Sequence, residues 1–210
     1  MTAFSTHFSK NNPIDRMVRA LVAAVFFAMS PLVMAQSSAE LSQIRAERVE
    51  DEILVSAQIG FELPTAVEEA LLKGIPMYFV AQADITKERW YWYDKKVASA
   101  ERSMRIVYQP LTRRWRLNVT TGADRGGSTG LALNQSFDTL PQALSVIKRL
   151  FRWKIAEASD LDGGGKHKLE LRFRLDLSQL PRPFQIGAIG QSDWDVGVSV
   201  ATPLVLETNK

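Results

Sequence analysis

The sequence predicts a mainly β fold, an antiparallel β-sandwich-like single domain with two short helices. Apolar and polar residues alternate with period two over residues 168–177, and the same period recurs over 53–61, 77–85, 115–119 and 194–200. In most of these segments one face is apolar and the other is polar, which is typical of antiparallel sheets with one solvated side. Two other stretches have helical spacing instead.

The two helical stretches carry the usual start and stop signals. Pro64-Thr65 opens the first, and Gly74 ends it. The second runs from about residue 138 to 151, with leucine and isoleucine at helical spacing and Pro141 in its first turn. Because both are short, we expect them to cover a sheet edge or a barrel mouth.

Turns and loops separate these elements. Glu50-Asp51 predicts a turn between a strand at about 44–49 and the next strand. Glycines concentrated between residues 122 and 130 predict a surface loop over 122–136. Pro181-Arg182-Pro183 predicts a rigid extended corner.

Residues 1–35 predict a cleaved secretory signal peptide. Arg16 and Arg19 precede the apolar run 20–29, and the small-residue pattern ending at Ala35 fits a cleavage site. The run is shorter than the roughly 20 residues that span a membrane, and an uncleaved anchor is the alternative. We therefore expect a periplasmic protein with one β-rich globular domain, residues 36–210.

Composition and charge exclude several classes of protein. The chain has no cysteine, which excludes disulfide scaffolds, thiolate metal sites and cysteine nucleophiles. Removing residues 1–35 takes away three basic and one acidic residue and leaves 23 basic and 22 acidic ones. Since nucleic-acid binding needs a clustered positive surface, nucleic acid is not an expected partner.

No sequence motif predicts catalysis, a metal or a cofactor. Ser128 lies in a G-x-S-x-G pattern, but no buried strand precedes it and no helical pattern follows it. Asp160 and Asp162 match the start of a calcium loop, whose twelfth position is Leu171 instead of glutamate. His167 is the one histidine of residues 36–210, too few for zinc without cysteine. We expect a protein that is not an enzyme.

The most unusual segment is a run of four aromatic residues bounded by charged ones. On a strand such a run alternates between faces, so that one pair faces the core while the other lines the surface. Cross-strand packing explains the run, and the alternative is a platform for a partner. The run consists of Trp90, Tyr91, Trp92 and Tyr93.

Arg114 and Arg116 are the other candidate binding residues. They share one face of a predicted strand, on either side of Trp115. Two arginines on one face can bind a carboxylate or an anionic lipid through paired hydrogen bonds. An ordinary solvated sheet face is the alternative.

Several segments of the chain together form one pattern, residues 89–94, 105–108, 111–115, 174–176, 180–183 and Trp194. In these segments the chain resembles a family of exported bacterial proteins described as domain of unknown function 4390. The resemblance implies a signal peptide and a gene of the kind that often lies beside those of a membrane histidine kinase and its response regulator. It supplies no catalytic residues.

We therefore expect a noncatalytic periplasmic interaction module, accessory to a membrane two-component sensor. Its expected partner is the histidine kinase or another envelope protein, bound through residues 90–93, Arg114 and Arg116, with peripheral or no membrane contact. The alternative is a carrier or weak hydrolase for an envelope glycan or lipid. Its cavity would lie between the sheet and the helix at residues 139–151.

Overall fold

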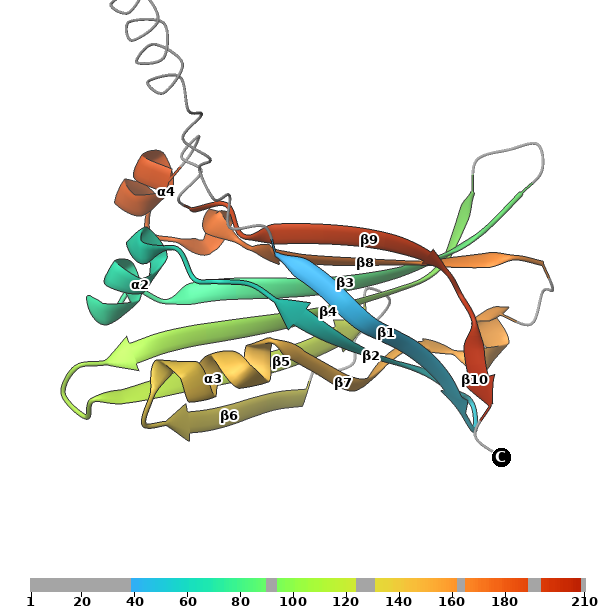
Figure 1. Ribbon diagram of the computed structural model, residues 1–210, viewed down its shortest axis with the longest axis horizontal. Helices are drawn as coiled ribbons and strands as arrows, with labels where there is room; N and C mark the ends of the chain where they lie inside the picture. Colours follow the sequence, from blue (N-terminus) through green and yellow to red (C-terminus); the bar gives the residue numbers. More distant parts are fainter. Residues whose placement is uncertain (1–38, 90–93, 124–130, 162–164, 189–193, 209–210) are drawn as a thin grey trace, which may run out of the picture. The chain divides into compact units, whose positions relative to one another are not determined.

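Two β-sheets make up most of the protein. The computed structural model describes residues 39–89, 94–123, 131–161, 165–188 and 194–208, which belong to one compact unit, Gln36–Lys210. Figure 1 shows strands of the smaller sheet crossing in front of those of the larger sheet. The expected mainly β, sandwich-like class is confirmed.

The smaller sheet has four strands in the order β10-β1-β2-β7. β1 and β2 form a hairpin whose turn contains Glu50, and β2 also pairs antiparallel with β7. β10 pairs with β1 in parallel, unlike the other strand pairs of the described residues. The bounds are β1 Glu40–Val49, β2 Glu52–Gly60, β7 Arg149–Glu157 and β10 Leu206–Thr208.

The larger sheet has six antiparallel strands in the order β6-β5-β4-β3-β8-β9. Its central strands alternate as period two requires, with odd-numbered residues of β3 facing the core and even-numbered ones facing outward. The bounds are β3 Met77–Lys87, β4 Lys95–Gln109, β5 Arg114–Ala123, β6 Leu131–Phe137, β8 His167–Leu175 and β9 Gly197–Pro203.

Aromatic side chains from both sheets meet in the core. Phe79 of β3 and Phe173 of β8 stack with ring centroids 5.7 Å apart, and Phe61, directly after β2, lies 5.4 Å from Phe173. All three rings are buried. Phe79 and Phe173 belong to the larger sheet, and Phe61 follows a strand of the smaller sheet. The three rings therefore join the two sheets.

Short helices lie at the ends of the strands. α2 (Thr65–Leu72) ends before Gly74, whose φ of 81° is a left-handed conformation that favours glycine, as predicted for this stop. α3 (Leu140–Ile147) follows Thr139 and has proline in its first turn. α4 (Arg182–Ala188) follows the 3-10 turn Leu177–Gln179. No helix among the described residues is long and apolar enough to cross a membrane.

Three local predictions were wrong. The second helix ends at Ile147, and Leu150 and Phe151 belong to β7. Residues 131–136, expected in a loop, form most of β6. The expected extended corner at Pro181-Arg182-Pro183 is the start of α4, because proline is tolerated in the first turn of a helix.

Candidate functional site

The predicted binding residues fall into two groups. Trp90, Tyr91, Trp92 and Tyr93 lie outside the described residues. Arg114 and Arg116 lie on the outward face of β5, with Trp115 buried between them. The guanidinium of Arg114 forms an ion pair with Asp138 at 3.1 Å. Arg116 is exposed and has no ion pair or side-chain hydrogen bond among the described residues.

The residues weighed for chemistry do not form a catalytic arrangement in the described part of the chain. Ser128 and Asp162 lie outside it. Asp160 accepts a hydrogen bond from the backbone N–H of Glu157 at 3.1 Å, which closes a local turn. His167 begins β8, and no group of three metal-ligating side chains lies together among the described residues.

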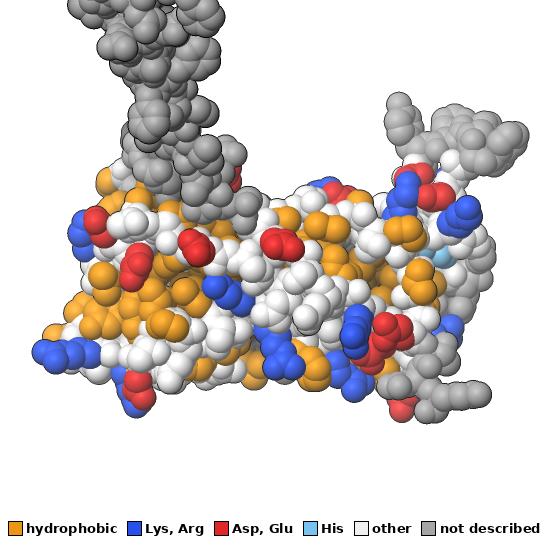
Figure 2. Space-filling model, in the orientation of Figure 1, with side chains coloured by type: hydrophobic (Ala, Val, Ile, Leu, Met, Phe, Trp, Pro, Cys, Tyr) orange, Lys and Arg blue, Asp and Glu red, His pale blue; other side chains and the backbone are white. Residues whose placement is uncertain are grey.

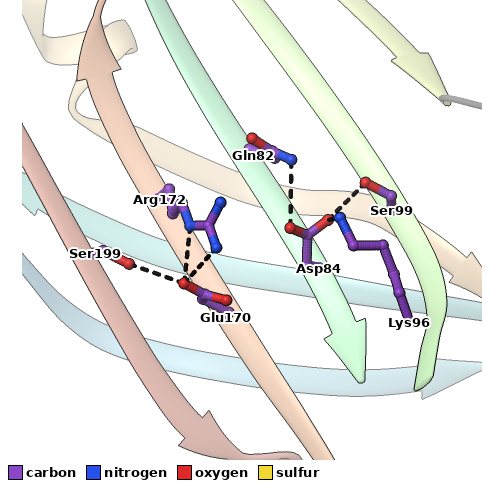
Figure 3. Close-up of polar contacts among 7 residues, drawn as sticks. All are labelled: Gln82, Asp84, Lys96, Ser99, Glu170, Arg172 and Ser199. Carbon is purple, nitrogen blue, oxygen red and sulfur yellow. Dashed lines mark hydrogen bonds and ion pairs between the residues drawn. The ribbon is translucent and has the colours of Figure 1, made fainter. Parts of the chain in front are cut away.

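The outward face of the larger sheet instead carries a network centred on Asp84 (Figure 3). Asp84 lies on β3 and is only 2% exposed. Ser99 of β4, directly opposite in the register, donates its hydroxyl to Asp84 Oδ1 at 2.6 Å. Lys96 Nζ lies 3.0 Å from the same oxygen, and Gln82 Nε2 donates to Oδ2 at 3.3 Å. Both carboxylate oxygens therefore have donors.

The pKa of Asp84 has opposing influences. Burial acts to raise the pKa, but the hydrogen bond from Ser99 and the charge of Lys96 outweigh it and hold the pKa below the ordinary aspartate value. Asp84 is therefore ionised at neutral pH. A carboxylate with a lowered pKa is a weak base, and the Ser99 hydroxyl that points at it is not activated as a nucleophile. The network favours a structural role.

A second charged group lies on the next strand. Glu170 of β8 is opposite Asp84 in the register. Its Oε1 accepts hydrogen bonds from Arg172 at 2.8 Å and from Ser199 of β9 at 3.3 Å. These side chains are half-exposed or exposed, so they form a solvated polar surface rather than an enclosed site.

The edge of the larger sheet formed by β6 differs from the rest of the surface. β6 pairs with β5 on one side, and no other described strand pairs with it. Its residues 133–136 are all exposed, so both faces of the strand are open to solvent. Its sequence, LALNQSF, contains no charged residue and no proline. Such an edge leaves a row of backbone donors and acceptors free for another strand.

The other three edge strands are protected in ways that proteins commonly use. β7 carries two register shifts in its pairing with β2 and has four charged side chains. β10 has three residues. β9 ends in Pro203 and contacts β1 of the other sheet. Among the four edges, β6 is the one without a charge, a bulge or a proline, and the short helix α3 contacts it.

Figure 2 shows how side chains are distributed on one face of the molecule. Hydrophobic side chains gather between α2 and α3, elements that contribute the half-buried Ala66, Leu140 and Leu144. Lys and Arg lie among Asp and Glu on this face, without one large basic patch.

Sequence reasoning missed the Asp84 network and the β6 edge. Asp84 occupies an outward-facing, polar position of a correctly predicted strand, and the alternation of that strand does not indicate that its side chain is buried. The strand β6 was not predicted, because the glycines that precede it indicated a loop. The alternation of Leu131, Leu133, Gln135 and Phe137 with smaller residues is the signal that could have found the strand.

A protein-family comparison identifies one match. The model described as Domain of unknown function (DUF4390) matches residues 36–202, most of the chain. No curated protein and no solved structure matches the chain.

Proposed function

Since this chain belongs to the DUF4390 family, we propose that it is a noncatalytic interaction module, which receives an extended segment of a partner protein along the free edge of β6. The observation that carries this proposal is the open, uncharged edge of a six-stranded sheet. Addition of a strand to such an edge is a common mode of peptide recognition, because main-chain hydrogen bonds supply affinity for any extended segment.

The side chains beside β6 favour a particular kind of segment. Arg116 is paired across the ladder with Ser136 of β6 and has no partner of its own among the described residues. An added strand would lie two strand spacings from β5, roughly 10 Å, which a long arginine and a carboxylate can bridge together. We therefore propose an extended segment with an acidic residue on the outward face. On the inward face, Leu133, 58% exposed, favours an apolar residue.

The place of action and the partner are part of the same proposal. The signal-peptide pattern of residues 1–35 supports export to the periplasm. The partner that we propose is the outward-facing part of a membrane histidine kinase, or another envelope protein. The lowered pKa of Asp84 and the donors already bound to it support a noncatalytic protein.

Site-specific photo-crosslinking in cells tests this proposal. We expect a photoreactive residue at Asn134, exposed on β6, to capture one envelope protein through one extended segment. The matched control is Ala201, exposed on the opposite edge strand β9, from which we expect no capture of that protein. Mass spectrometry of the cross-linked peptides identifies the segment. Equal capture from both positions, or none from Asn134, would contradict docking at β6.

A further inference from the structure

Arg102 is an arginine that faces the core. It lies on β4 between Ala100 and Met104, both buried, and pairs with the buried Ala81 of β3. Its guanidinium carbon lies 5.2 Å from the ring centroid of Trp153, which is 1% exposed and belongs to β7. The side chain therefore reaches between the two sheets and stacks on a core aromatic ring.

The half-buried side chain of Arg102 has no charged partner among the described residues. Its Nε is buried without an acceptor, and no carboxylate pairs with the guanidinium within the described residues. Burial lowers the pKa of Arg102, because removal of water disfavours the charged form. The indole Nε1 of Trp153 is also buried without an acceptor. The stacked guanidinium and indole therefore each carry a buried N–H without an acceptor, which is costly unless something accepts its hydrogen bond.

An apolar surface leads away from Arg102 along the inward face of the larger sheet. Thr121 of β5 is directly opposite Arg102. In the next row of the sheet, Met104 is followed by the half-buried Val119 of β5 and then by Leu133 of β6. Val119 is two residues from the buried Leu117 and therefore faces inward like it. Leu133 is paired with Val119, so this exposed leucine also lies on the inward face.

The elements of the smaller sheet leave this surface partly open. β7 is the edge strand of that sheet and contacts β4. β5 and β6 continue beyond β4 and are contacted by α3 instead. The half-buried Arg102 thus lies at one end of a surface on which Val119 is half-buried and Leu133 is exposed.

We propose that Arg102 and Trp153 form the headgroup end of a binding site for a single-chain anionic amphiphile, a carboxylate with a hydrocarbon tail. The carboxylate accepts hydrogen bonds from the guanidinium and from the indole, and the tail covers Val119 and Leu133. Arg102 and Trp153 take no part in partner docking at the backbone edge of β6, and Leu133 is the one residue that the two proposals share. Carboxylates are the natural partners of arginine, and each buried methylene of a tail adds about 0.8 kcal/mol to binding.

The test is an NMR titration of the whole domain with dodecanoate, below its micelle concentration. We expect the side-chain Nε–H resonance of Arg102 to shift on binding, which stacking on Trp153 alone does not produce. Acetate supplies the headgroup without the tail, and dodecyl maltoside supplies the tail without the charge. We expect both to bind at least about tenfold more weakly than dodecanoate.

Substitutions separate the two parts of the site. Arg102→Met should weaken dodecanoate binding at least about tenfold with little change in Tm, because the half-buried guanidinium has no carboxylate partner to lose and methionine keeps an apolar chain against Trp153. Arg102→Lys keeps the charge without the guanidinium and should also weaken binding. Arg105→Met removes an exposed arginine of the same strand, which stacks on Tyr78 on the outward face of β4, and should leave dodecanoate binding unchanged.

Three results would overturn the proposal. The first is the absence of any Arg102 Nε–H shift in wild-type protein, a result that does not depend on how a variant folds. The second is equal binding of dodecanoate to Arg102→Met and wild type. The third is acetate binding as tight as dodecanoate binding, which would leave a site for small anions without a tail.

Discussion

Replacing Phe173 with alanine is expected to lower the free energy of unfolding by about 3–5 kcal/mol. Phe173 is 1% exposed, stacks on Phe79 and lies 5.4 Å from Phe61, so its removal leaves a cavity where the two sheets meet. The loss is a large share of the roughly 5–15 kcal/mol that stabilises a typical domain. Urea unfolding at neutral pH, followed by circular dichroism, measures it.

The control for this prediction is Phe151→Ala. Phe151 is 60% exposed on β7, and its contact is with the guanidinium of Arg149, 5.1 Å from the ring centroid. An exposed contact of this kind contributes about 0.5–1 kcal/mol. If both variants lost the same stability, Phe173 would not be a core residue and the described packing of the two sheets would be wrong.

Replacing Asp84 with alanine is expected to cost about 2–3 kcal/mol at pH 7. The hydrogen bond from Ser99 to the ionised carboxylate, at 2.6 Å, belongs to the stronger class, and its loss leaves the hydroxyl without its acceptor. The ion pair with Lys96 adds little, because the lysine side chain is 48% exposed. The matched control is Glu170→Ala on the neighbouring strand, for which we expect less than about 1 kcal/mol.

This effect should depend on pH in a definite direction. The pKa of Asp84 is lowered in the folded protein, so the unfolded chain binds the proton more readily. The contribution of Asp84 is therefore complete above the unfolded pKa, near 3.8, and is lost as pH falls through the lower folded pKa. We expect the stability difference between wild type and Asp84→Ala to shrink as the medium is acidified below about pH 4. A difference that grew on acidification would contradict this direction.

Strands with uninterrupted period-two alternation were predictable from the sequence. β2, β3 and β8 match their predicted segments closely, because apolar side chains fill every core-facing position. The first helix was equally readable, since Pro64 and Gly74 mark its ends. These signals are local, and they do not depend on which strands are neighbours.

Two strands, β4 and β7, were not predicted from the sequence, because neither has a regular alternation of apolar and polar residues. In β4 the core-facing positions include small alanines and Arg102, so the longest strand of the described residues shows no continuous apolar face. In β7 a bulge near Arg152, whose φ is 42°, places Leu150 and Trp153 three residues apart and imitates helical spacing.

The candidate site was only partly predictable. Strand alternation correctly placed Arg114 and Arg116 on one face of β5. Burial of Asp84 depends on Ser99 and Lys96 from another strand, and the free edge of β6 depends on the order of strands in the sheet. Pairing between segments distant in sequence determines both features.

The central claim, that a partner docks on the free edge of β6, is tested most directly by proline substitution. Successive backbone N–H groups of a strand point to opposite edges. Of Gln135→Pro and Ser136→Pro, one removes an N–H bonded to β5 and destabilises the fold, while the other removes an N–H at the free edge and leaves Tm nearly unchanged.

The measurement is the yield of photo-crosslinking from Asn134 in whichever of these two variants keeps the wild-type Tm. Our account predicts that capture of the partner falls about tenfold or more, because the proline removes a main-chain donor and its ring obstructs an incoming strand. Undiminished capture in that stable variant would contradict docking by strand addition at β6.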